Sequence, residues 1–184
     1  MNRRATMLLN VAISQAGWFG VVLAAARGMP ALAALVACAG VAAHLVLMPH
    51  GVRRTELQIV LAVMAVGALW DSALAASGVI RYPNGQWSAY LAPYWLVGLW
   101  ALFATTLNVS MRWMHGRWLM AILFGGMGGP LSFWAGARLG AAHFPDPVLA
   151  LVLIGLGWAV LMPLLVRITM ALDAPRAAQH LAAQ

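Results

Sequence analysis

Residues 117–140, RWLMAILFGGMGGPLSFWAGARLG, combine an apolar run long enough to cross a membrane with residues that weaken a helix. A bilayer core about 30 Å thick needs about 20 apolar residues of helix, and here the only charges, Arg117 and Arg138, lie near the two ends. The middle of the run nevertheless contains four glycines and Pro130, which lacks a backbone donor and crowds the preceding turn. The stretch therefore predicts a membrane-crossing helix whose central residues weaken the helix.

The composition of the whole chain is that of a membrane protein. Of its 184 residues, 64% are hydrophobic and 8% are charged, whereas about a quarter of the residues of a soluble domain are charged. All eleven basic residues are arginines, and they are scattered between apolar runs rather than clustered, so we expect no nucleic-acid partner. The single cysteine, Cys38, excludes a disulfide within the chain.

Apolar runs bounded by Arg, Pro and Gly divide the chain into six candidate membrane crossings. They lie at about 6–26, 30–49, 55–79, 91–111, 117–140 and 147–171. The connections between them are short and leave no room for a soluble domain. We therefore expect residues 1–184 to form a single transmembrane domain, an all-α bundle of six helices, with a short cytoplasmic tail at 172–184.

The arginines indicate which side of the membrane each end of the bundle occupies, because cytoplasmic loops carry an excess of basic residues. With the N-terminus inside, eight arginines are cytoplasmic and three are not, which favours cytoplasmic N- and C-termini. The eight are Arg3, Arg4, Arg53, Arg54, Arg112, Arg117, Arg167 and Arg176, and the three are Arg27, Arg81 and Arg138.

Small residues in the opening stretch recur at helical spacing. Gly125, Gly129, Ser132, Gly136 and Gly140 follow one another at steps of three or four and share one helix face. Such a face lets a second helix approach closely, and residues 12–28 offer a similar face as its counterpart.

A second interpretation of the same stretch is a kink at Pro130, which packing alone does not require. Irregular backbone at membrane depth is tolerated only where protein or a water-filled cavity surrounds it. Both interpretations, a tightly packed helix and a kinked helix that lines a cavity, remain open.

Asp71 is the only acidic residue clearly within a predicted span. A carboxylate in hydrocarbon costs several kcal/mol unless it is protonated, paired or hydrated, so we expect Asp71 to face the bundle interior. It falls at a depth that Arg138 can reach. Asp71 therefore forms either a structural ion pair with Arg138 or a protonatable, ligand-facing site.

A second polar set lies toward the cytoplasmic half of the helices and includes His44, Thr105 and Asn108. These side chains either join helices by hydrogen bonds or line a polar cavity that opens inward. The candidate cavity residues are Asp71, Arg138, Asn108, Thr105, His44, Gly125, Gly129 and Pro130.

Known enzyme motifs are missing from the sequence. Its five histidines are too few and too dispersed for a membrane di-iron site, and only His44 is deep enough to ligate a haem. There is no nucleophile elbow, no zinc-protease motif and no Asp-rich magnesium motif. We therefore expect no catalytic residue, no bound cofactor and no metal.

Three segments carry a resemblance to a known family: LWDSALAASGV at 69–79, LFATTLNVSMRW at 102–113 and GGPLSFWAGARLGA at 128–141. Together they resemble a bacterial family of small inner-membrane proteins catalogued as a domain of unknown function. The resemblance implies a multi-span protein of the inner membrane of Gram-negative bacteria, in a context of membrane-lipid modification or envelope stress. It carries over no catalytic residue.

Two hypotheses for function follow. The first is small-solute transport or membrane-lipid handling through a polar cavity beside a kinked, glycine-rich helix. The second is a non-transporting scaffold, or an accessory subunit of a lipid-modifying or envelope complex. In either case the expected partners are membrane lipids, and a second copy or another membrane protein can dock on the small-residue helix faces.

Overall fold

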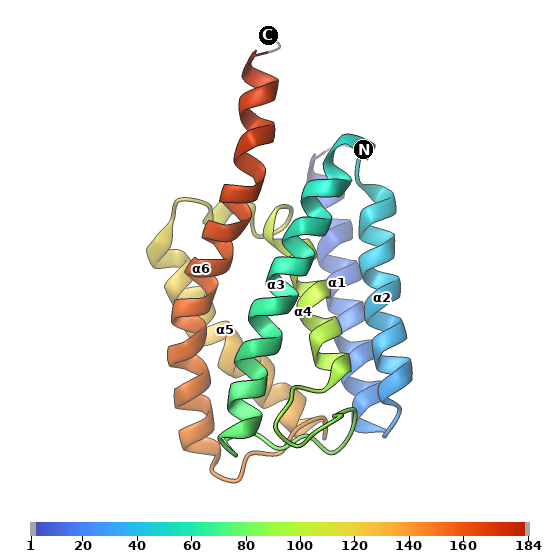
Figure 1. The fold of residues 1–184 in the computed structure, drawn as a ribbon, viewed down its shortest axis with the longest axis vertical. Helices are drawn as coiled ribbons and strands as arrows, with labels where there is room; N and C mark the ends of the chain where they lie inside the picture. The colour runs from blue at the N-terminus through green and yellow to red at the C-terminus, as the bar shows by residue number, and fades with distance from the viewer. Residues whose placement is uncertain (1–2, 183–184) are drawn as a thin grey trace.

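The computed structural model describes the backbone of residues 3–182 and the side chains of residues 4–174. In this range the chain forms six α-helices and one short 3-10 helix (Figure 1). They are α1 (Arg3–Ala26), α2 (Pro30–Leu47), α3 (His50–Ala76), α4 (Tyr94–Leu107), η1 (Arg112–Met114), α5 (Trp118–Arg138) and α6 (Pro147–Ala182). The all-α prediction is therefore confirmed.

Five of these helices, α1, α2, α3, α5 and α6, are long and apolar enough to cross a membrane. The remaining helix, α4, has 14 residues instead of the 21 expected from the run at 91–111. At 1.5 Å per residue it spans about 21 Å, less than the hydrocarbon core. It begins after Pro93 and ends where the Thr105 and Thr106 hydroxyls donate back to carbonyls of their own helix, at 2.7 and 2.6 Å.

Two other helices differ from expectation at one end. The third begins at His50 rather than near residue 55, with Pro49 preceding its first turn, and this places Glu56 firmly inside the helix. The sixth does not end at 171. It continues to Ala182 and extends beyond its neighbours in Figure 1, so the tail expected at 172–184 is helical as far as Ala182.

The helices form two groups. One contains α1 to α4, in which α1 packs on α2 and α4, and α4 also packs on α2 and α3. The other is the α5–α6 hairpin, which joins the first group mainly where α6 meets α3 (Figure 1). Because α6 makes this contact and α5 packs chiefly on α6, a cleft remains between α5 and the α1–α4 group.

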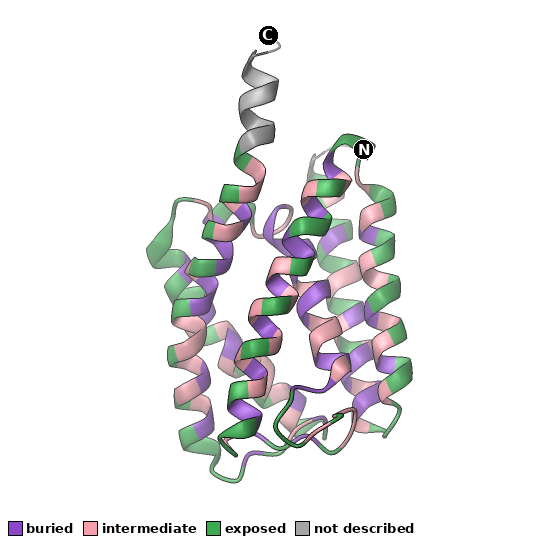
Figure 2. Cartoon of the chain, in the orientation of Figure 1, coloured by how far each residue is buried: buried purple, intermediate pink, exposed green. Residues whose placement is uncertain are grey.

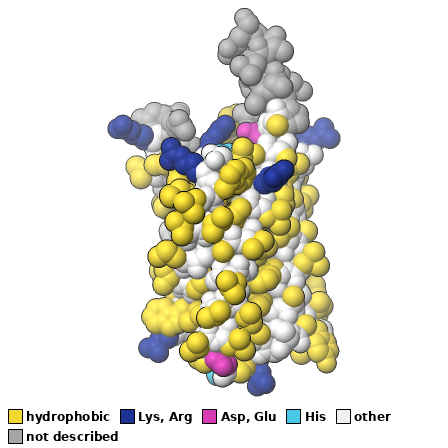
Figure 3. Space-filling model, turned by 90° about the vertical axis from the view of Figure 1, so that its left-hand side faces the viewer, with side chains coloured by type: hydrophobic (Ala, Val, Ile, Leu, Met, Phe, Trp, Pro, Cys, Tyr) yellow, Lys and Arg dark blue, Asp and Glu magenta, His cyan; other side chains and the backbone are white. Residues whose placement is uncertain are grey.

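The outer surface of the bundle matches a lipid environment. Buried residues follow the inward faces of the helices, and exposed residues dominate the outward faces (Figure 2). Large apolar side chains such as Leu35, Leu69 and Val160 are among the exposed ones. In Figure 3 a broad hydrophobic band separates basic side chains at the two ends of the molecule. These features indicate a membrane-embedded protein.

The two ends of the bundle differ in charge. We call the end where α1 and α3 begin the arginine-rich end. Among described side chains it carries Arg4, Arg53, Arg54, Arg112, Arg117 and Arg167, and the opposite end carries Arg27, Arg81 and Arg138. At that opposite end an irregular segment, residues 77–93, folds back across the helices, and the Asn84 amide donates to the Ala25 carbonyl at 2.9 Å.

Candidate functional site

The glycine-rich part of α5 is a packing surface for α6. The helix runs without a break through Pro130. A Cβ at Gly125 would collide with the Trp158 carbonyl oxygen, and one at Gly129 would collide with the Trp158 ring. Gly125 therefore lets the two backbones approach closely, and Gly129 makes room for the Trp158 ring. At these two positions the neighbour is α6 and not the α1 face that the spacing offered as a counterpart, whereas Ser132 on the same face contacts Trp18 of α1.

The position of Pro130 explains how α5 tolerates it. Proline removes the hydrogen bond that the Gly126 carbonyl would accept within the helix. That oxygen lies 3.3 Å from the point where a Cβ on Gly155 of α6 would lie, and the Pro130 ring lies 3.2 Å from the same point. The freed carbonyl thus faces the backbone of α6 at a point where no side chain intervenes, a geometry suited to weak Cα–H···O contacts.

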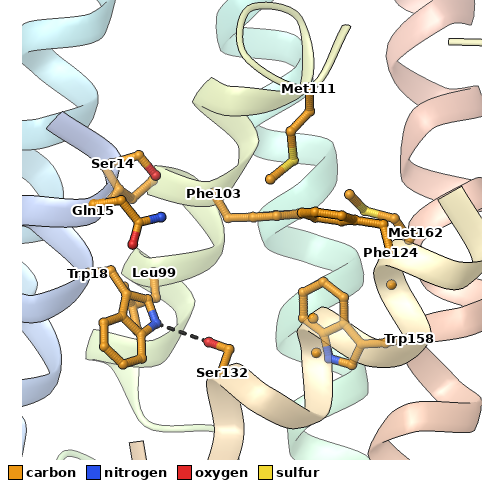
Figure 4. Close-up of a pocket in the computed structure, with 14 residues that line it drawn as sticks. Ser14, Gln15, Trp18, Leu99, Phe103, Met111, Phe124, Ser132, Trp158 and Met162 are labelled. Carbon is orange, nitrogen blue, oxygen red and sulfur yellow. Dashed lines mark hydrogen bonds between the residues drawn. The ribbon is translucent and has the colours of Figure 1, made fainter. Parts of the chain in front are cut away.

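Between α5–α6 and the α1–α4 group lies a hollow of about 200 Å³, which we call the aromatic cleft (Figure 4). The Trp18 indole of α1 donates to the Ser132 hydroxyl of α5 at 3.1 Å, joining its two walls. The remaining walls are mostly apolar. Its lining includes Ser14, Gln15, Trp18, Leu99, Phe103, Met111, Phe124, Gly128, Ser132, Trp158 and Met162.

Two smaller hollows, of about 80 and 50 Å³, share Trp18, Leu99 and Ser132 with the aromatic cleft and extend it. The smaller one is also lined by Tyr82 of the 77–93 segment. No charged side chain of the described chain lines the cleft or its extensions.

Asp71 lies behind the wall of this cleft rather than in it. Its carboxylate is fully buried and accepts a hydrogen bond from the Trp100 indole at 2.6 Å. The Trp100 ring in turn stacks on Trp158, with centroids 4.8 Å apart. Trp158 lines the aromatic cleft, so the stacked pair separates Asp71 from it.

The proposed partner of Asp71, Arg138, is elsewhere. Arg138 is exposed in the last turn of α5, and its guanidinium lies 6.0 Å from the centroid of the Trp134 ring. Among the described residues it forms no ion pair with Asp71. A cation at a helix end is better solvated outside the bundle than beside a sealed carboxylate. Of the two alternatives that the sequence left open for Asp71, the ion pair with Arg138 is absent from the described chain.

The second polar set does come together, in what we call the α1–α4 polar network: Asn10, His44, Glu56, Thr105 and Asn108. His44 Nε2 lies 3.1 Å from Glu56 Oε2, and the Asn108 amide donates to Glu56 Oε1 at 3.0 Å. The Asn10 amide donates to the Thr105 carbonyl at 3.0 Å and lies 3.5 Å from His44 Nδ1. All five side chains are more than nine-tenths buried.

The structure thus divides the candidate residues among four places. Gly125, Gly129 and Pro130 lie where α5 meets α6, and the two glycines also line the aromatic cleft. His44, Thr105 and Asn108 lie in the polar network, Asp71 is sealed behind Trp100, and Arg138 is exposed at the end of α5.

Sequence reasoning missed Glu56, because the arginines at 53 and 54 suggested a helix end in water. Its apolar neighbours at positions 52, 59, 60 and 63 share a helical face with it and were the available signal.

Comparison with known proteins identifies one family. A family model described as "Protein of unknown function (DUF2878)" matches residues 7–164, which is most of the chain. This match confirms the resemblance seen in the sequence to a domain of unknown function. No curated protein and no solved structure matches the chain.

Proposed function

The chain belongs to the DUF2878 family, and we propose that it handles membrane lipid by holding an acyl chain in the aromatic cleft. The observation that carries the proposal is the lining of the cleft. Aromatic, methionine and glycine residues surround it, no charge faces it, and Ser14, Gln15 and Ser132 supply a few polar groups. Predominantly apolar walls with few convergent polar groups are typical of sites for apolar ligands.

The same lining argues against transport of small polar solutes. Such a path needs polar groups at successive depths. Here Asp71 is screened by the Trp100–Trp158 pair, and none of the five network residues lines the aromatic cleft. The scaffold hypothesis loses its main support too, since Gly125 and Gly129 already pack on α6 within the chain.

We also propose the membrane arrangement that lipid handling requires. The described ends of the chain lie at the same end of the bundle (Figure 1), as six crossings demand. The short α4 completes the sixth crossing together with the 77–93 segment. The excess of arginines at the end that holds both termini supports a cytoplasmic location for that end, in the bacterial inner membrane.

Filling the cleft tests the proposal. Gly128 lines the cleft, and a Cβ there would meet only the Phe124 ring, at 3.8 Å. Gly128→Leu should therefore fold, place its side chain where the acyl chain lies, and lower lipid retention about tenfold, equivalent to about 1.4 kcal/mol. Retention is measured by mass spectrometry of lipids that remain on the purified protein.

The matched control is Gly51→Leu, at an exposed position of α3 where a Cβ would meet nothing within 4 Å. It adds the same side chain outside the cleft and should retain lipid like the unmodified protein. Equal retention by both variants would show that lipid does not occupy the cleft.

A further inference from the structure

The His44–Glu56 pair lies outside the aromatic cleft and has no role in lipid binding there. Its side chains are 3% and 4% exposed, whereas the other ion pair of the described chain, Arg112–Asp173, has its arginine 55% exposed. A carboxylate at this depth requires a proton or a cation beside it. Among the described side chains, His44 is the one ion-pair partner of Glu56, and it carries a positive charge only when protonated.

The network around the pair leaves two buried acceptors unused. Asn10 Oδ1 and Asn108 Oδ1 have no hydrogen-bond partner among the described residues. The Asn108 amide orientation is set by Glu56, because a carboxylate oxygen requires the NH₂ group to face it. Buried acceptors are almost always satisfied in proteins, by water where the chain offers no donor. Both oxygens therefore mark positions for water beside the pair.

Two hollows lie at these positions. One of about 10 Å³, roughly the space of a single water, is lined by Asn10 and His44. The other, about 340 Å³, is lined by Asn108 and Arg112 at the arginine-rich end. Thr6 and Met48 line both, so the two hollows adjoin. Water from the end of the bundle can thus approach His44 on one side and the Asn108–Glu56 contact on the other.

We infer that His44 and Glu56 form a proton-binding site that exchanges with water through these hollows. A proton taken up from that water is held between His44 Nε2 and Glu56 Oε2, and the pair gains one unit of charge. Among the described residues no third His, Cys, Asp or Glu joins them, so the pair lacks the ligand set of a metal site. The site is independent of the aromatic cleft and does not require lipid binding.

Other charged groups at this end are engaged elsewhere or face outward. Arg53 of α3 donates to the Met48 and Val46 carbonyls at 3.0 and 2.9 Å, and His115 bonds the Leu107 carbonyl at 3.1 Å. Arg112 lies 3.7 Å from Asp173 of α6. The remaining ones, Arg4 of α1, His50 and Arg54 of α3, Arg117 just before α5 and Arg167 of α6, are exposed. None of them pairs with His44 or Glu56 in the described chain.

The sequence permits a test without any mutation, since Glu56 is the only glutamate in the chain. Cell-free synthesis with glutamate labelled at the δ-carbon marks the Glu56 carboxyl group by its isotope shift in the infrared spectrum. The full-length protein is placed in lipid bilayers and titrated from about pH 9 to 4, a range that brackets ordinary His and Glu values. We expect the infrared band of the labelled carboxyl group to change in a single transition across this pH range. The same band should shift promptly when H₂O is replaced by D₂O.

Two variants separate the pair from the other buried carboxyl. His44→Gln should move the midpoint of the Glu56 transition by about one pH unit or more, a tenfold change in proton affinity. The Asp71 carboxyl group hydrogen-bonds Trp100 and not the His44–Glu56 pair. Asp71→Asn should therefore leave the midpoint of the Glu56 transition unchanged. A labelled band that keeps one form throughout the range, fails to respond to D₂O, or titrates identically in His44→Gln overturns the inference.

Discussion

Replacing Trp100 by phenylalanine is expected to lower the free energy of unfolding by about 3 kcal/mol. The substitution removes the indole N–H that bonds Asp71 at 2.6 Å and leaves a fully buried carboxylate without a described donor. Without this donor the buried carboxyl oxygen is left unsatisfied, and that costs its desolvation in full, which exceeds the loss of ring area. The free energy is measured by titrating the protein in mixed micelles with a denaturing detergent.

Trp158 provides the matched control for this prediction. It stacks on Trp100 in the same pair, and its indole nitrogen has no hydrogen-bond partner among the described residues. Trp158→Phe therefore makes the same side-chain change without breaking a hydrogen bond, and should cost less. In a protein that already carries Asp71→Leu, Trp100→Phe should lower the free energy of unfolding by little more than Trp158→Phe does. Equal costs with and without the Asp71 carboxyl would contradict this account of the Trp100 hydrogen bond.

The second large effect is expected where α5 meets α6. Gly125→Ala places a methyl group against the Trp158 carbonyl oxygen and 2.5 Å from the Met162 Cβ. Neither atom is the end of a flexible side chain, so the helices must separate. Overpacking of this kind costs about 1–3 kcal/mol, and we expect the upper part of that range. The same detergent titration measures it, with protein abundance in the membrane as a second readout.

Gly136→Ala is the control on the same helix, because a Cβ at Gly136 would meet nothing within 4 Å. It should be neutral or slightly stabilising, since alanine has the higher helix propensity. If Gly125→Ala were as stable as Gly136→Ala, the close approach of α5 and α6 would not depend on the glycine face.

The sequence predicted the class of fold and the kind of residue that packs helices together, but not which helices are partners. Small residues recur at steps of three or four on α1 and α5, and α6 contributes Gly155 and Gly157. The presence of small residues alone does not determine which of these helices pair. The choice depends on helix rotation and on the loop that joins α5 to α6, which places these two helices side by side.

The candidate site shows a similar limit. Polarity and depth in the sequence correctly grouped His44, Thr105 and Asn108. Glu56 was missed because α3 begins earlier than the apolar run suggests. The hydrogen bond of Asp71 to Trp100 was not among the alternatives that the sequence offered, because a tryptophan is read from sequence as an apolar residue although its indole N–H is a donor.

The lipid-handling proposal is tested most directly by photo-cross-linking. The protein is reconstituted in vesicles that contain a phospholipid with a photoreactive group on its acyl chain, and the adducts are mapped by mass spectrometry. We predict adducts on cleft residues such as Phe103, Phe124 and Trp158, and their loss in Gly128→Leu. Adducts confined to outward residues such as Leu35 and Leu69, and unchanged in Gly128→Leu, would contradict the proposal.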